Sequence, residues 1–215
     1  MTDNINYKHI VNFLNDTLPK GEGILGELEE YALLHSTPII QKEVRGLLNS
    51  ILEYKKCNRI LEIGSAIGYS AIFFAMHLPP QGELITLEKD EDYISRAKLN
   101  FEKSGLSHKI TMIEGDAEES VKNLSGKFDL VFIDANKSKY KQYFDTLLPL
   151  VNKGGMIICD NILYKGMVSD GEYLSRKQAT IVNALREFLP YIANHKGVAT
   201  SIIPIGDGLT ISVKK

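Results

Sequence analysis

The sequence has little cysteine, no tryptophan and no long hydrophobic run, and these shortages exclude several classes of protein. Its 215 residues include only two cysteines, Cys57 and Cys159, which are too few for a disulfide framework or a zinc site. No apolar stretch reaches the length of a membrane span. The first ten residues lack the basic and then apolar form of a signal peptide. We therefore expect a cytoplasmic protein with no membrane association.

The chain also lacks a marked excess of charge of either sign. It has 25 Lys and Arg residues against 27 Asp and Glu residues, a formal net charge of −2. This balance does not indicate a nucleic-acid-binding protein, although it is compatible with a local basic patch. The composition, 44% hydrophobic and 24% charged, is that of an ordinary globular domain. The length suffices for one domain with a sizeable core.

Apolar spacing predicts a helical extension over residues 1–56 and an α/β core over residues 57–215. In the core, continuous apolar runs alternate with helical patterns, which favours parallel strands, right-handed crossovers and a doubly wound sheet. The expected strands are Arg59–Ile63, Leu84–Leu87, Ile110–Ile113, Leu130–Ile133 and Met156–Cys159. The expected helices between them are Tyr69–His77, Glu91–Lys103, Ala117–Leu124 and Lys139–Leu147.

The end of the chain departs from this alternation. After a last helix around Arg176–Leu189, two strands are expected at Thr200–Ile205 and Leu209–Val213. Only Gly206-Asp207-Gly208 joins them, and so short a connection predicts a hairpin. The final strand should therefore run antiparallel to its neighbour.

The most informative stretch is Asn58–Ser70, NRILEIGSAIGYS, in which a short strand turns through two glycines into a helix. Such a turn leaves backbone N–H groups free at the helix start and lets a ligand approach the backbone. Ala66 stands where the dinucleotide fingerprint G-x-G-x-x-G has its second glycine. The turn indicates a nucleotide-type cofactor site, although close packing of the strand against the helix is an alternative interpretation.

Each of the five expected parallel strands ends near a polar or acidic residue, and ligands of open α/β sheets bind beyond these strand ends. Glu88 lies 20 residues after Gly68 and can accept hydrogen bonds from both hydroxyls of a ribose. Asp116-Ala117 can hold an adenine edge. Helix capping or a charge at a helix N-terminus would explain either acid taken alone.

Asp134, Asp160 and Asn161 follow the last two of these strands and supply only oxygen ligands. Such a set favours Mg²⁺, Mn²⁺ or Ca²⁺ over zinc or copper. Lys137 lies three residues after Asp134, where a nearby cation would favour its neutral form and allow it to act as a general base. The alternative interpretation is two helix caps, an asparagine turn and a solvated lysine. We interpret Lys139 and Lys141 as solvated charges.

Three segments together resemble the metal-dependent class I O-methyltransferases, the family that includes the catechol and caffeoyl-CoA enzymes. LEIGSAIGYSA resembles the S-adenosylmethionine (SAM) motif, FIDANKSKY the metal-and-base segment, and GGMIICDNILYKGMV the second metal segment. The resemblance extends from about Thr37 to the C-terminus. It implies a Rossmann-like α/β fold with a seven-stranded, mostly parallel sheet, an antiparallel last strand and helices on both faces. It also implies SAM, a divalent metal and a homodimer.

The resemblance also implies roles for individual residues. Lys137 would be the base that takes the proton from a metal-chelated hydroxyl, whose oxygen then attacks the methyl group. Asp134 would contact both metal and cofactor, and Thr37–Gln41 would cover the methyl-donor end. The implied cofactor-binding residues are Glu62, Gly64, Ser70, Glu88, Asp116, Ala117 and Asp134, and the implied metal ligands are Asp134, Asp160 and Asn161.

The segments LHSTPII and PIGDGLTIS are similar to those of bacterial tRNA methyltransferases that convert wobble 5-hydroxyuridine to 5-methoxyuridine. This similarity implies the tRNA anticodon loop as substrate. The alternatives are a small catechol or phenylpropanoid-like substrate, an NAD-type oxidoreductase, or a non-catalytic binding protein. Candidate phosphate contacts are Lys8, Lys42, Lys55, Lys56, Arg59, Lys165, Arg176 and Lys177.

Overall fold

The computed structural model describes residues 5–169 and 175–215. The chain divides into two compact units, one of Asp16–Leu124 and one of Met1–Asn15 with Ser125–Lys215. Helix α1 (Lys8–Thr17) crosses the boundary at residue 15, and none of its residues is buried. The expected single domain, with an extension over 1–56 and a core over 57–215, is not tested by this division and stays a prediction.

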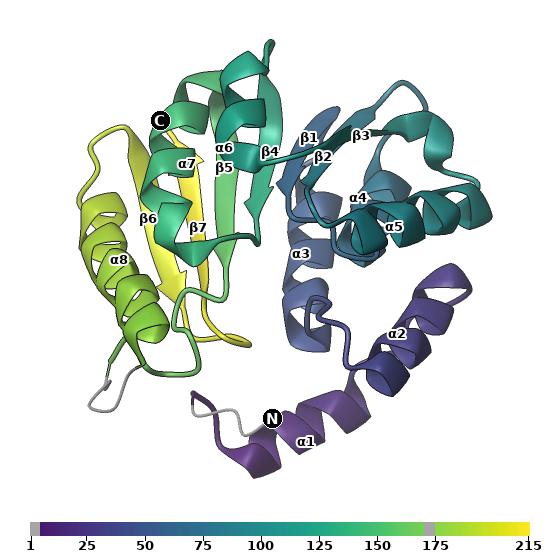
Figure 1. Ribbon diagram of the computed structural model, residues 1–215, viewed down its shortest axis with the longest axis horizontal. Helices are drawn as coiled ribbons and strands as arrows, with labels where there is room; N and C mark the ends of the chain where they lie inside the picture. Colours follow the sequence, from purple (N-terminus) through teal and green to yellow (C-terminus); the bar gives the residue numbers. More distant parts are fainter. Residues whose placement is uncertain (1–4, 170–174) are drawn as a thin grey trace. The chain divides into compact units, whose positions relative to one another are not determined.

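The Asp16–Leu124 unit contains a parallel sheet and two preceding helices, α2 (Ile24–His35) and α3 (Lys42–Tyr54) (Figure 1). Its strands pair in parallel, with β2 between β1 and β3. This arrangement confirms the predicted strand–helix alternation. The further elements are β1 (Arg59–Ile63), α4 (Tyr69–His77), β2 (Glu83–Glu88), α5 (Glu91–Ser104), η1 (Ser107–Lys109), β3 (Ile110–Glu114), α6 (Ala117–Ser120) and η2 (Val121–Asn123).

The second unit carries the reversed strand. Strands β4 (Phe128–Ile133) and β5 (Val151–Asp160) pair in parallel, whereas β7 (Leu209–Lys214) runs antiparallel to both β5 and β6 (Val198–Ile203). The predicted C-terminal hairpin is therefore confirmed. Helix α8 packs against β6 (Figure 1). The remaining elements are η3 (Lys137–Lys139), α7 (Tyr140–Leu147), η4 (Leu148–Leu150) and α8 (Arg176–Ala193).

Seven strands thus occur in the part of the chain that the structure describes, and the fold class expected from the resemblance is confirmed. The interior strands are continuous apolar runs because parallel strands are covered on both faces. Ile60, Leu61 and Ile63 of β1 are fully buried, as are Leu130 and Val131 of β4.

Two of the expected helices include 3₁₀ turns that the prediction did not contain. The one expected over Ala117–Leu124 is a single α-helical turn, α6, followed by the 3₁₀ turn η2. The one expected over Lys139–Leu147 is entered through the 3₁₀ turn η3, which the Asn136 side chain caps by accepting from the Ser138 amide at 3.2 Å. Tight 3₁₀ turns are common at helix termini and leave no separate signal in apolar spacing.

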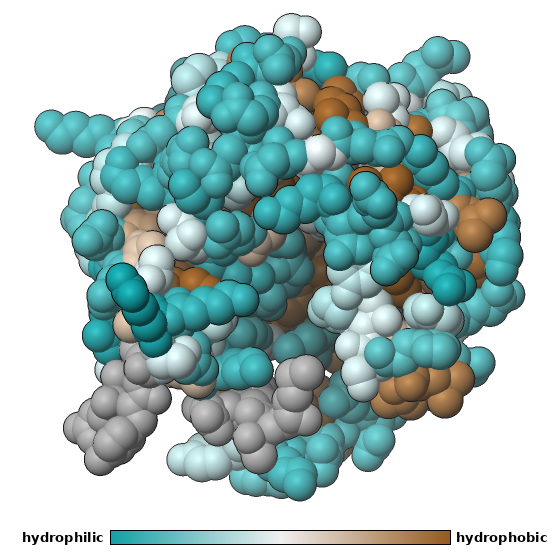
Figure 2. Space-filling model, viewed as in Figure 1, coloured by the Kyte–Doolittle hydropathy of each residue, from teal (hydrophilic) through white to brown (hydrophobic). Residues whose placement is uncertain are grey.

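Both cysteines are buried, and neither forms a disulfide bond. Burial raises the pKa of the Cys159 thiol to about 12, so this side chain behaves as a small apolar residue. Across residues 5–169 and 175–215, no helix is long and apolar enough to cross a membrane. Figure 2 shows a mainly hydrophilic face on which hydrophobic side chains form separate patches.

Candidate active site

The turn after β1 adopts backbone angles that favour glycine. Gly64 and Gly68 have φ values of 93° and 86°, and Ala66 between them has a φ of 44°. A Cβ atom on Gly68 would lie 2.6 Å from Cε1 of Phe101 in α5. Gly68 therefore serves both left-handed geometry and close helix packing. Gly68 thus packs closely on α5, and the binding of a cofactor at this turn stays a prediction.

Glu88, the last residue of β2, accepts a hydrogen bond from the backbone of this turn. Its Oε2 accepts from the Ala66 amide at 2.9 Å, and its Oε1 accepts from the amides of Lys89 at 2.9 Å and Asp90 at 3.1 Å. A carboxylate offers about four acceptor positions, so capacity remains for a ribose hydroxyl. The cap of α5 is a different acid, Asp90, which accepts from the amides of Asp92 and Tyr93. Capping therefore does not account for Glu88.

Glu62 and Ser70 are both buried, so neither side chain lies at the surface. Glu62 is fully buried, and its Oε2 accepts from Oγ1 of Thr86 at 2.6 Å. Thr86 is its partner in the β1–β2 register, which explains the contact. Ser70 is 8% exposed in the first turn of α4. The cofactor-binding roles of both residues stay predictions.

Asp116 does act as a helix cap. Its Oδ1 accepts from the Glu118 amide at 2.8 Å at the start of α6, and its Oδ2 lies 3.4 Å from Nζ of Lys89. The capping interpretation of Asp116 is therefore confirmed. The adenine-binding role of Asp116 and Ala117 stays a prediction.

The predicted metal-and-base residues lie in the other unit, at the ends of two neighbouring parallel strands. Asp134 follows β4 directly, and Asp160 ends β5. Nζ of Lys137 lies 2.8 Å from Oδ1 of Asp134, and both side chains are largely buried, at 18% and 27% exposed. Asp160 is 1% exposed, and its Oδ1 accepts from the Asn161 amide at 2.7 Å. The structure thus brings Asp134 and Lys137 into contact and buries the second carboxylate.

Asn161 directly follows β5, and Tyr140 contacts the last residue of β5. Asn161 has a φ of 57°, a left-handed conformation that asparagine tolerates better than most residues. The Tyr140 hydroxyl donates to the backbone oxygen of Asp160 at 2.9 Å, and Tyr140 is fully buried. The sequence analysis missed this tyrosine, although it ends the FIDANKSKY segment. Its contact fixes the end of β5, where the predicted ligands lie.

The electrostatics of this centre favour a cation. Burial, followed by the charge of Asp134, raises the pKa of Asp160 to about 8, although the Asn161 amide and Lys137 act in the opposite direction. The protein thus holds a second carboxylate beside Asp134, and the Lys137 ammonium group offsets their repulsion only in part. A bound cation would stabilise both ionised carboxylates. The donor set therefore fits a hard divalent ion.

No group of three or more His, Cys, Asp and Glu side chains that could hold a metal ion occurs among residues 5–169 and 175–215. The predicted set is of another kind, because it contains two carboxylates and an amide. The metal assignment therefore stays a prediction.

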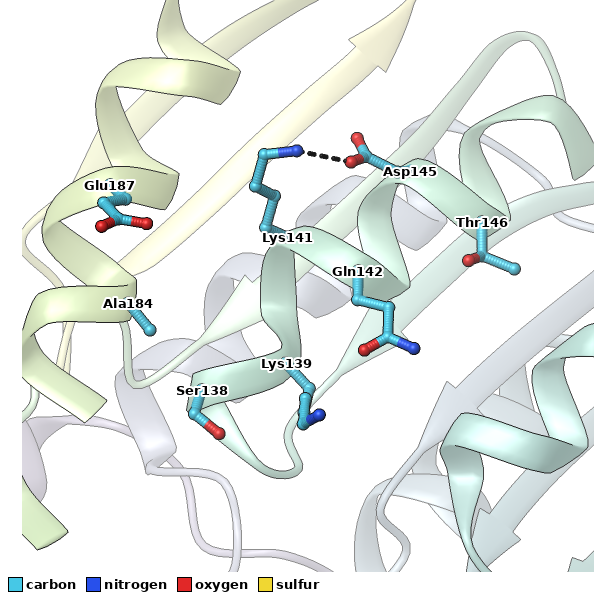
Figure 3. Close-up of a pocket in the computed structure, with 8 residues that line it drawn as sticks. All are labelled: Ser138, Lys139, Lys141, Gln142, Asp145, Thr146, Ala184 and Glu187. Carbon is cyan, nitrogen blue, oxygen red and sulfur yellow. Dashed lines mark hydrogen bonds and ion pairs between the residues drawn. The ribbon is translucent and has the colours of Figure 1, made fainter. Parts of the chain in front are cut away.

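A surface hollow of about 460 Å³ is lined by residues of η3, α7 and α8 (Figure 3). Nζ of Lys141 lies 2.7 Å from Oδ2 of Asp145 at its edge, and both side chains are substantially exposed. This exposed pair agrees with the interpretation of Lys141 as a surface charge. The hollow is lined by Ser138, Lys139, Lys141, Gln142, Asp145, Thr146, Ala184 and Glu187, none of which we assign to the reaction.

The chain matches the O-methyltransferase family model over residues 20–215. A catechol O-methyltransferase from Niastella koreensis is 31% identical over 177 residues, which cover 78% of each chain. A caffeoyl-CoA O-methyltransferase from Populus kitakamiensis is 31% identical over 171 residues, which cover 76% of this chain and 73% of that protein. The crystal structure of the O-methyltransferase TomG from Streptomyces achromogenes in complex with SAM has a TM-score of 0.84, with 26% identity and 100% of both chains covered. The chain therefore belongs to the O-methyltransferase family and is a SAM-dependent O-methyltransferase.

Proposed function

We propose that this O-methyltransferase depends on a divalent metal held by Asp134, Asp160 and Asn161. The observation that carries the proposal is the buried Asp160 carboxylate, which ends a strand beside the Asp134–Lys137 pair. Mg²⁺ suits these oxygen ligands best, and Mn²⁺ or Ca²⁺ are the other candidates. When bound, such an ion lowers the pKa of a coordinated hydroxyl and orients it.

Lys137 is the proposed general base. The 2.8 Å contact with Asp134 holds its amine in one position, and the amine lies 5.9 Å from the centre of the Tyr140 ring. A cation close to Lys137 would favour the neutral amine by charge repulsion. Lys137 then takes the proton of the acceptor hydroxyl, and the resulting oxygen attacks the methyl group of SAM in line. The bond between that methyl group and the sulfonium sulfur breaks, and S-adenosylhomocysteine leaves. The protein contributes orientation and charge stabilisation.

For the cofactor, we propose that the turn over residues 64–68 and Glu88 form the centre of the binding site. Glu88 would accept from the ribose hydroxyls with the acceptor capacity that its three amide contacts leave. Asp116 and Ala117 would hold the adenine. Thr37–Gln41 would cover the methyl-donor end, which Glu62, Gly64, Ser70 and Asp134 would also serve.

The proposed acceptor is 5-hydroxyuridine at the wobble position of tRNA. Its 5-hydroxyl and 4-carbonyl oxygens can chelate a metal as the two oxygens of a catechol do. Three exposed cations support a polyanionic substrate. Lys165 lies four residues after Asn161, and Arg176 and Lys177 are the first two residues of α8. The segment with Lys165 packs on α8, where Nε of Arg186 donates to the Val168 carbonyl at 2.8 Å. These cations could contact phosphates beside a flipped or unpaired base.

The remaining candidate phosphate contacts receive weaker support. Lys56 pairs with Glu53 at 2.8 Å, and Arg59 pairs with Glu83 at 2.8 Å. Their charges are therefore partly compensated within the protein. Lys8, Lys42 and Lys55 are kept only as secondary candidates.

A small vicinal diphenol or phenylpropanoid-like compound is the second candidate acceptor. Its support is the description of the relatives as catechol and caffeoyl-CoA enzymes. The same metal and base would act on it, so the two candidates differ only in the substrate. Membership of the O-methyltransferase family favours an O-methyltransferase over the NAD-type oxidoreductase and the non-catalytic binding protein.

We also propose that the enzyme is a cytoplasmic homodimer. Leu33 and Leu34 on α2 are 83% and 79% exposed, which is unusual for adjacent leucines and would suit a contact with a second copy. Light scattering would measure the mass in solution. A monomer at micromolar concentration would contradict the dimer.

Transfer of labelled methyl groups from SAM tests the acceptor. The substrates are tRNA carrying 5-hydroxyuridine, the same tRNA without the hydroxyl, and a simple catechol. We expect label in the hydroxylated tRNA alone. Label in the catechol alone would contradict the tRNA assignment and favour the second candidate.

A further inference from the structure

A buried polar network lies next to the glycine turn and joins three helices of the Asp16–Leu124 unit. It consists of Glu29 on α2, Arg45 on α3 and Tyr69 on α4, and we name it the Glu29–Arg45–Tyr69 network. The Tyr69 hydroxyl donates to Oε1 of Glu29 at 2.7 Å and accepts from Nη1 of Arg45 at 3.0 Å. Arg45 also donates to Glu29 directly, at 2.6 Å.

The same network reaches the segment before α2. Nη2 of Arg45 donates to the Pro19 carbonyl, and the Gly21 amide lies 3.1 Å from both carboxylate oxygens of Glu29. Tyr69 is only 2% exposed and Arg45 only 9%. Apolar side chains would pack the three helices without the cost of removing these charges from water. Directional bonds instead restrict the helices to a narrow range of relative positions.

The position of Tyr69 in the sequence links the Glu29–Arg45–Tyr69 network to the glycine turn. Tyr69 is the first residue of α4, between Gly68 and Ser70. Gly68 packs closely on Phe101, so α5 and the anchored side chain of Tyr69 both hold the exit of the turn. The backbone amides of this first helical turn are the ones that can face a ligand.

We propose that the Glu29–Arg45–Tyr69 network positions the first turn of α4 for SAM and couples cofactor binding to the segment over residues 19–29. This inference rests on the proposed placement of SAM at the glycine turn. The three residues are positioning residues, because they act through the backbone of Tyr69 and Ser70. Burial, followed by the hydrogen bond to Glu29, raises the pKa of the Tyr69 hydroxyl well above its ordinary value, so the hydroxyl stays protonated at physiological pH.

Replacing Tyr69 with phenylalanine tests the coupling, because the change removes one hydroxyl and leaves the Glu29–Arg45 pair. In Tyr69→Phe we expect the Kd for S-adenosylhomocysteine and the KM for SAM to rise roughly three- to tenfold. The kcat at saturating SAM should stay within about twofold, since the reacting groups are untouched. The matched control is Tyr54→Phe, because Tyr54 is 94% exposed in the same unit. A Tyr69→Phe enzyme with a lower Tm but an unchanged Kd and KM would overturn the proposal. The network would then only stabilise the fold.

Two further measurements make the test decisive. In the unaltered enzyme, S-adenosylhomocysteine should slow amide hydrogen exchange in residues 19–29, and exchange that is equal with and without it would overturn the coupling even if Tyr69→Phe failed to fold. The Glu88→Ala variant separates this inference from the cofactor placement. If Glu88→Ala binds S-adenosylhomocysteine normally, the placement at the turn fails. If Glu88→Ala weakens binding and Tyr69→Phe does not, only the role of the network fails.

Discussion

The ammonium group of Lys137 lies 2.8 Å from Oδ1 of Asp134, one residue beyond the end of β4. Both side chains are largely shielded from solvent. They lie at the end of β4, which pairs with β5, and β5 ends at Asp160. An ion pair in this position has two uses in the proposed reaction. It holds the base in place, and it keeps a carboxylate ready for a metal.

Replacing Lys137 with alanine should remove turnover while cofactor binding is retained. We expect a decrease in kcat of about 10²- to 10⁴-fold, the usual contribution of a positioned general base. The Kd for S-adenosylhomocysteine, measured by calorimetry, should stay close to that of the unaltered enzyme. Lys141→Ala is the matched control, because Lys141 pairs with Asp145 at the surface. Full activity in Lys137→Ala would remove this lysine from its role.

The stability of the metal-free protein should fall as the pH rises from about 4 to about 8. Burial raises the folded-state pKa of Asp160 to about 8 from an ordinary value of 3.8, so between these values the folded state binds more protons than the unfolded state. Stability from this group is therefore fully present below the ordinary pKa and is lost as the pH rises to the folded-state pKa, because the unfolded carboxyl is ionised in this range while the buried one stays protonated. Urea unfolding in EDTA at several pH values measures the effect.

Asp160→Asn is the control for that measurement, because it keeps the shape of the side chain and removes the titration. We expect a flatter dependence of the free energy of unfolding on pH in this variant. Mg²⁺ should stabilise the unaltered protein at pH 8 and have little effect on Asp160→Asn. The same pH dependence in both proteins would mean that Asp160 is not the group responsible.

Removing the exposed cations Lys165 and Lys177 should weaken tRNA binding in a salt-dependent way. In a Lys165→Ala/Lys177→Ala variant, the slope of log K against log salt should become shallower by roughly one to two, because each phosphate contact releases counterions. Lys196→Ala is a matched control, an exposed lysine in the same unit beyond the end of α8. Filter binding over a range of salt concentrations gives the slopes. Equal slopes in all three proteins would count against phosphate contacts at these positions.

Apolar patterning was sufficient to predict most of the fold. The interior of β1 reads as a continuous apolar run because parallel strands are buried on both faces, and its predicted bounds agree with the structure. The last hairpin was predictable because a connection as short as Gly206–Gly208 allows no crossover. The 3₁₀ turns η2 and η3 were not predictable, since capping by a side chain such as Asn136 leaves the apolar spacing unchanged.

The candidate site was predictable in its residue types but not in its contacts. Glu88 was identified from its distance to Gly68, but its bond to the Ala66 amide depends on how the turn folds back on β2. The burial of Glu62 against Thr86 follows from strand register, which the sequence does not state. The Glu29–Arg45–Tyr69 network joins residues 16 to 40 positions apart, and nothing in local spacing links them.

Metal dependence of methyl transfer tests the central claim most directly. The measurement is the rate of transfer of labelled methyl groups from SAM to tRNA carrying 5-hydroxyuridine and to a catechol, in EDTA and with Mg²⁺ restored. If Asp134, Asp160 and Asn161 hold a metal that acidifies the acceptor hydroxyl, transfer to the true acceptor stops in EDTA and returns with Mg²⁺. Transfer that continues undiminished in EDTA would contradict the account.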